Sequence, residues 1–169
     1  MVTRNWYNLF KSQRAKIVIP QATKSVNGVE RAAGYYSSSP HDYNILFCSA
    51  SAVATNPSYP QGICVGSGTT PPTYEDYKLE SMITSGISGT VKTTLDDNND
   101  TVWTLTITNS SSADITIGEV GYFNVGFYGA GNSTDYFMYE RTVLDTPITI
   151  AAGGFGQVTY TIRFNYPTV

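Results

Sequence analysis

The chain has 169 residues and a formal net charge of −3, which is enough length for one domain with a sizeable core. Only 14% of its residues are charged, against about 25% in an average domain, while Thr, Ser, Asn, Gly and Tyr are abundant. This composition argues against a nucleic-acid partner and against a helical bundle. It favours β-structure, because β-branched and aromatic side chains fit a pleated sheet.

The first 31 residues form a basic segment, with six basic side chains against Glu30 alone, whereas the remainder carries four basic and twelve acidic residues. Within residues 5–13, Trp6, Leu9 and Phe10 recur at helical spacing, which predicts a short amphipathic helix. A basic arm of this kind can dock on an acidic neighbouring subunit. Two alternatives stay open: the basic side chains are simply solvated, or the apolar stripe packs on the body of the same chain. The candidate interface residues are Arg4, Trp6, Leu9, Phe10, Lys11, Arg14, Tyr35 and Tyr36.

Farther along, residues 16–19 predict a strand closed by Pro20, and residues 43–48 predict a buried strand between two loops. Asn27-Gly28 predicts a hairpin with a type I′ turn, in which both residues have positive φ angles. We therefore expect a basic arm, helix and hairpin over residues 1–31 and a β-sandwich domain over residues 32–169.

The C-terminal half alternates apolar and polar residues with the period of a strand. Gly118 marks a bulge, because the apolar phase shifts across it. The longest unbroken alternation, residues 157–166, is expected to lie centrally in its sheet. The predicted fold class is all-β: an antiparallel β-sandwich, Ig-like or jelly-roll-like, with a short N-terminal helix and one short helical turn near residues 73–80. Strands are predicted over residues 87–95, 103–107, 115–117, 142–146, 148–150 and 157–166.

The segment VGSGTTPPTYEDYKLES, residues 65–81, has the glycines of a phosphate-binding loop but not its chemistry. Such a loop needs a Lys-Ser/Thr pair and backbone N–H groups aimed at the phosphates, and Pro71-Pro72 remove those donors. The prolines instead stiffen an extended segment. Thr73 and Asp76 have the spacing of a reciprocal cap. The segment is therefore interpreted as a structural clip that packs on the sheet.

Catalytic and metal-binding patterns are scarce, and we predict no catalytic, cofactor-binding or metal-binding residues. His41 is the single histidine, and no nucleophile motif accompanies it, so a small hydrolase built around it ranks as the third hypothesis. Cys48 and Cys64 are expected to be free, buried thiols. Residues 96–100 have only the first part of a calcium-loop pattern and are interpreted as a polar turn. No signal peptide or membrane span is visible, which predicts folding in a cytoplasm and no membrane partner.

Tyrosines are unusually frequent, and several lie in predicted loops, among them Tyr35, Tyr36, Tyr59 and Tyr128. Aromatic side chains in loops suit protein interfaces and stacking on sugar rings. A carbohydrate-binding module serving host adhesion is therefore the alternative function. An equally simple explanation is that these tyrosines cover the open ends of a sandwich.

A family resemblance is carried by four segments: VGSGTTPPTYEDYKLES, SGISGTV, WTLTITNSSSADITIGEVGYF and ERTVLDTPITIAAGGFGQVTYTIRF. Together they resemble small β-rich virion proteins encoded by tailed bacteriophages, and the similarity covers roughly residues 65–166. The resemblance implies a non-enzymatic assembly subunit of the capsid decoration, head-fibre or tail-associated type. It also implies that the chain folds in the host cytoplasm, forms homo-oligomers and has other virion proteins as partners. Removal of residues 1–14 is expected to leave the sandwich folded but to stop its incorporation into particles.

Overall fold

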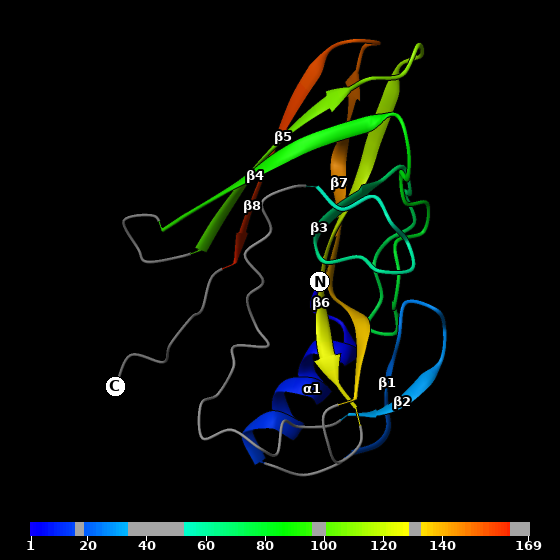
Figure 1. The fold of residues 1–169 in the computed structure, drawn as a ribbon, viewed down its shortest axis with the longest axis vertical. Helices are drawn as coiled ribbons and strands as arrows, with labels where there is room; N and C mark the ends of the chain where they lie inside the picture. The colour runs from blue at the N-terminus through cyan, green and yellow to red at the C-terminus, as the bar shows by residue number, and fades with distance from the viewer. Residues whose placement is uncertain (16–18, 34–52, 96–100, 129–132, 163–169) are drawn as a thin grey trace.

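A computed structural model describes residues 1–15, 19–33, 53–95, 101–128 and 133–162 (Figure 1). The described part contains one helix and eight strands, and all the strand pairs are antiparallel. The elements are α1 (Arg4–Ala15), β1 (Ile19–Lys24), β2 (Glu30–Ala33), β3 (Gly62–Gly66), β4 (Ile87–Leu95), β5 (Thr101–Asn109), β6 (Ile115–Phe127), β7 (Thr134–Ile150) and β8 (Phe155–Ile162). The all-β class expected from composition and alternation is confirmed.

The strands form two three-stranded sheets, with the orders β3-β6-β7 and β4-β5-β8, and a separate β1-β2 hairpin. Apolar side chains of both larger sheets share one core. The ring of Trp103 on β5 stacks on Tyr122 of β6 with centroids 5.5 Å apart, which joins the sheets at their inner faces. The two sheets therefore contact each other through this core, and their closure into a sandwich stays a prediction. Whether the topology is Ig-like or jelly-roll-like stays a prediction.

The alternation in the C-terminal half correctly predicted which residues face inward. On β8, Val158 and Tyr160 are buried, whereas Thr159 and Thr161 are exposed. The prediction that this strand lies centrally in its sheet was wrong. In the described part of the chain β8 is an edge strand, and β5 is the central strand. The apolar face did not reveal this, because burial of a face says nothing about which edges are paired.

The predicted bulge at Gly118 is confirmed, and its consequence is larger than expected. Ile117 pairs with Ile148 but Glu119 pairs with Val143, so four residues of β7 lie opposite Gly118 without a regular partner. The strands predicted over residues 142–146 and 148–150 are parts of this single long strand β7, which is irregular at the bulge.

The N-terminal segment belongs to the body of the molecule. The backbones of Met1 and Arg141 exchange hydrogen bonds of 2.6 and 3.1 Å, so the chain start lies along β7. Asn5 is buried and donates to the carbonyl oxygens of Lys24 and Met138. Leu9 is 1% exposed and lies in the main core. Removing residues 1–14 would open this core, so the expectation that the truncated chain folds normally disagrees with the structure.

The hairpin between β1 and β2 is confirmed, but its turn differs from the prediction. The N–H of Gly28 donates to the carbonyl of Ser25, and Gly28 has a φ of 79°. The N–H of Ser25 in turn donates to the carbonyl of Val29. This is a three-residue connection whose glycine takes the left-handed position after the turn, rather than a two-residue type I′ turn. Pro20 lies within β1 rather than closing a strand.

Candidate functional site

The segment from Gly66 to Met82, called the clip below, is a loop whose two ends are joined to each other. Gly66 forms a β-bridge with Met82, and the N–H of Ser67 donates to the carbonyl of Ser81 at 2.8 Å. At the far end, the N–H of Thr73 donates to Asp76 Oδ2 at 2.9 Å and its hydroxyl donates to Oδ1 at 2.7 Å. Only half of the predicted reciprocal cap is therefore present, because the N–H of Asp76 does not donate to the hydroxyl of Thr73 but to its carbonyl.

The secondary structure of the clip corrects the prediction of a helical turn near residues 73–80. The N–H of Asp76 donates to the carbonyl of Thr73, which closes a single turn, and none of residues 73–80 is helical. Thr73 is therefore not a helix N-cap, because the side chain of an N-cap accepts hydrogen bonds from N–H groups of the first helical turn. Its hydroxyl donates to the carboxylate of Asp76 and fixes that carboxylate in place.

The clip lies close to β6 because Gly118 stands there. A Cβ atom at position 118 would lie 2.7 Å from the carbonyl oxygen of Gly68 and 3.2 Å from that of Ser67. These are backbone atoms of the clip, which cannot move aside as a flexible side chain does. The glycine at the irregularity between β6 and β7 therefore also makes room for the clip.

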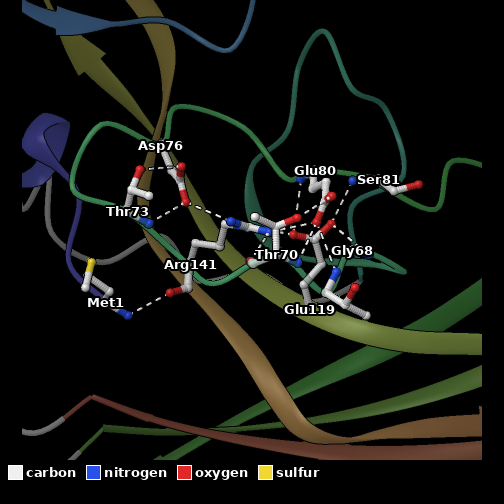
Figure 2. A network of polar contacts seen from close by, with 10 residues as sticks. Met1, Gly68, Thr70, Thr73, Asp76, Glu80, Ser81, Glu119 and Arg141 are labelled. Atoms are coloured by element: carbon white, nitrogen blue, oxygen red, sulfur yellow. Dashed lines mark hydrogen bonds and ion pairs between the residues drawn. The ribbon is translucent and has the colours of Figure 1, made fainter.

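Two buried charged residues fasten the clip to the sheet (Figure 2). Glu119 on β6 is fully buried and accepts hydrogen bonds from the N–H groups of Gly68, Glu80 and Ser81. Its Oε2 atom also accepts from Arg141 Nε on β7 at 2.7 Å. Every oxygen of this carboxylate is thus occupied, which is what burial of a charged group demands.

Arg141 connects the turn at the tip of the clip with residues nearer its base. Figure 2 shows its guanidinium reaching between the turn at Asp76 and the residues around Glu80. Nη1 donates to Asp76 Oδ2 at 2.8 Å, and Nη2 donates to the carbonyl of Thr70 at 3.1 Å and approaches Glu80 Oε2 at 3.4 Å. One planar cation thus binds three carboxylates and a carbonyl, which its fork of donors permits.

The network shifts the ionisation of its members. Burial would raise the pKa of Asp76, but hydrogen bonds from Thr73 and Arg141 outweigh it and lower that pKa. Hydrogen bonds from the hydroxyl and N–H of Thr70 are the main reason why the pKa of Glu80 is also lowered. Burial works against the charge of Arg141, yet Asp76 and Glu119 raise its pKa. The shifts of Asp76, Glu80 and Arg141 all favour the charged form of the side chain.

Two hollows flank the clip. The larger, about 300 Å³, is lined by the outer part of the clip and by Arg141. The smaller, about 200 Å³, lies between the hairpin turn, residues 57–60 and the base of the clip. The polar groups of Arg141, Asp76 and Glu80 in the larger hollow already bind one another, so they are not available to activate a substrate.

The predicted interface residues are partly inside the molecule. Leu9 is in the core and Trp6 packs against it, so α1 turns its apolar stripe toward its own chain. Arg4 forms ion pairs with Glu30 and Glu75. The side chains of Phe10, Lys11 and Arg14 on α1, and the whole of Tyr35, Tyr36, His41 and Cys48, lie outside the described part of the structure.

Other apolar side chains of the N-terminal segment and of the clip are exposed. Val2 is 43% exposed, Tyr7 on α1 is 50% exposed, and Tyr74 at the tip of the clip is 45% exposed. The N–H of Arg4 donates to the carbonyl of Tyr74 at 2.8 Å, so the N-terminal segment that carries Val2 and Tyr7 lies against the tip of the clip. We call Val2, Tyr7 and Tyr74 the N-terminal patch.

The two residues that fasten the clip, Glu119 and Arg141, were missed by reasoning from sequence. Glu119 follows the strand predicted over residues 115–117, Arg141 precedes the one predicted over residues 142–146, and neither was singled out. A signal does exist, because Glu119 stands in the run Ile117-Gly-Glu-Val-Gly-Tyr122, where a charged side chain between apolar residues indicates a buried pair. The partner of that pair cannot be read from the run itself.

No protein family, curated protein or solved structure matches this chain significantly. In the described residues, no helix is long and apolar enough to cross a membrane. The same residues contain no group of three His, Cys, Asp or Glu side chains placed to hold a metal ion. Cys64 on β3 is a free, buried cysteine, and burial raises the pKa of its thiol.

Proposed function

We propose that the chain is a non-enzymatic structural subunit of a bacteriophage virion, assembled with other virion proteins at the capsid or the tail. The observation that supports this most is the contrast between the inward-bound charged side chains of the clip and its exposed tyrosine. The carboxylates of Asp76 and Glu80 bind inward to Arg141, and backbone N–H groups of the clip bind Glu119. Tyr74 at the tip of the clip is instead 45% exposed. Exposed apolar side chains that lie together on a folded protein indicate an interaction surface, and we infer that the three of the N-terminal patch do so.

The same observation favours assembly over catalysis. The group of charged side chains around Arg141 is saturated with internal hydrogen bonds. Such a network keeps a loop in one conformation, since removing Arg141 leaves the buried carboxylate of Glu119 without its cation. A rigid clip presents its tyrosine in a fixed position, and an interface residue that is already ordered loses less entropy on binding. The family resemblance of residues 65–166, which include the clip, points to the same role.

The test is incorporation into particles. Tyr7→Ser and Tyr74→Ser, singly and together, replace exposed rings and should leave the thermal midpoint of the free protein nearly unchanged. The matched control is Phe155→Ser, because Phe155 is 79% exposed at the turn between β7 and β8, away from the patch. Mass spectrometry of purified phage particles should find the wild type and the control at the same copy number and the double variant strongly depleted.

Two results would contradict the proposal in different ways. Absence of the wild-type chain from purified particles would overturn the virion role itself. Normal incorporation of the double variant would leave that role standing but would show that the N-terminal patch is not the assembly surface.

A further inference from the structure

The smaller hollow has a different chemical character from the rest of the clip region. It opens onto the outer face of sheet β3-β6-β7, where Val26, Leu79 and Phe123 form an apolar floor. Three separate segments surround it: the hairpin turn, residues 57–60 and the base of the clip. With a volume of about 200 Å³, it is smaller than the roughly 300–1,000 Å³ of sites for drug-sized ligands, so it suits one small ring.

The rim of this hollow holds polar groups that have no partner. Among the described residues, the Asn27 amide and the Ser58 hydroxyl make no hydrogen bond, and the Lys78 ammonium makes no ion pair. The Lys78 ammonium only approaches the ring of Tyr77, 5.8 Å from its centroid. This contrasts with the larger hollow, where the polar groups at Arg141 are saturated. Free donors around an apolar floor are the usual composition of a small-molecule site.

Charge decides between classes of ligand. The described residues that line the hollow include one cation, Lys78, and no carboxylate. An ammonium without a counterion favours an anionic ligand, because a charge-assisted hydrogen bond is stronger than one between neutral groups. A neutral or cationic ligand would form no ion pair with the Lys78 ammonium.

Tyr59 provides the flat surface that a sugar ring uses. It stands between Ser58 and Pro60, both of which line the hollow, and it is 64% exposed. Its ring meets that of Tyr136 edge-on, with centroids 5.6 Å apart and an interplanar angle of 78°, so it has support from β7. Tyr59 does not itself line the hollow. As an exposed ring next to two lining residues, it can cover the apolar face of a sugar while its hydroxyl stays in water.

We propose that this hollow binds one carboxylated sugar residue of a surface polysaccharide. The carboxylate pairs with Lys78, the ring hydroxyls bond to the Asn27 amide and the Ser58 hydroxyl, and Tyr59 lies against the sugar. An acidic peptide is the other source of a carboxylate. The sugar is favoured because the free groups at the rim are side chains around a ring-sized space, rather than a row of backbone donors and acceptors that would pair with an extended chain. The inference does not depend on the proposed assembly role.

The experiment measures binding of three probes to the full chain by saturation-transfer NMR and calorimetry. The probes are methyl glucuronide, its neutral isostere methyl glucoside, and N-acetyl-glutamate amide. The glucuronide should bind best, by about tenfold or more over the glucoside, since one charge-assisted hydrogen bond is lost. Lys78→Met and Tyr59→Ala should each weaken glucuronide binding by about tenfold or more.

The controls are a lysine and a tyrosine that are exposed elsewhere, Lys92→Met on β4 and Tyr74→Ala at the clip tip, and both should bind like the wild type. Circular dichroism verifies that all four variants fold, as expected for exposed positions. No binding of the glucuronide at millimolar concentration would overturn the proposal, as would binding that survives both Lys78→Met and Tyr59→Ala. Equal binding of the glucoside would overturn the requirement for a carboxylate, and tighter binding of the glutamate probe would replace the sugar with a peptide.

Discussion

The Nε atom of Arg141 lies 2.7 Å from Oε2 of Glu119, and the side chains are 4% and 0% exposed. The two residues stand on neighbouring strands, β7 and β6, and each also binds the clip. A pair buried this deeply is costly to desolvate and is retained only where further hydrogen bonds satisfy both partners. Here those bonds come from the clip, so the pair and the clip stabilise each other.

Arg141→Met should therefore be strongly destabilising. It leaves Glu119 charged and buried without its cation, which costs roughly 3–5 kcal/mol. The matched control is Arg4→Met, whose two ion pairs are partly exposed and are worth about 0–1 kcal/mol. Urea unfolding midpoints measure both. The double variant Arg141→Met with Glu119→Leu should recover part of the loss, and equal midpoints for the Arg141 and Arg4 variants would contradict the role of the buried pair.

Acid should loosen the clip before it unfolds the core. The folded-state pKa values of Asp76 and Glu80 lie below the ordinary values of 3.8 and 4.5. A lowered pKa contributes stability that is present above the ordinary value and is lost as the pH falls through the folded value. Stability of the wild type should therefore drop as the pH decreases below about 4.5. Asp76→Asn with Glu80→Gln should show a flatter pH dependence over this window, and parallel curves would contradict the assignment.

Gly118→Ala should displace the clip. The added Cβ would meet the carbonyl oxygen of Gly68 at 2.7 Å, and such overpacking costs roughly 1–3 kcal/mol. Hydrogen exchange should show faster exchange of the amides of Gly68 and Ser81, which donate to Glu119. Gly153→Ala is the control: its φ of 71° makes the substitution strained, but a Cβ there meets nothing within 4 Å. That variant should lose stability without exposing the two clip amides.

The two faces of β8 should respond differently to truncation. Tyr160 is 8% exposed, and its ring centroid lies 6.0 Å from that of Trp103. Tyr160→Ala should cost roughly 3–5 kcal/mol through lost burial and a cavity, a large part of the 5–15 kcal/mol that typically stabilises a domain. Thr161→Ala on the exposed face should change stability by about 0.5 kcal/mol or less. Urea midpoints decide, and equal losses would mean that both faces of β8 are buried. Phe164, on the same predicted face as Tyr160, lies outside the described residues.

Local chemistry was sufficient for the parts of the fold that depend on neighbours in the chain. Alternation placed Trp103, Leu105 and Ile107 in the core, and the spacing of Trp6 and Leu9 identified α1. The prolines and the Thr73–Asp76 pair identified the clip as a structural element before its position was known. These features were predictable because strand pleat, helix period and turn geometry each depend on residues a few positions apart.

Only the tertiary structure decided which distant residues meet. Arg141 lies 65 positions from Asp76 and 22 from Glu119, and no local pattern links them. Three other features likewise could not be predicted from local patterns: the edge position of β8, the single long strand β7 and the inward-facing apolar stripe of α1. Each depends on which surfaces come together when the sheets pack, and the alternation of a strand fixes its buried face but not its neighbour. The sequence by itself thus determined an all-β chain with a helix and a clip. The buried ion pair that fastens the clip exists only because folding brings β6, β7 and the clip together.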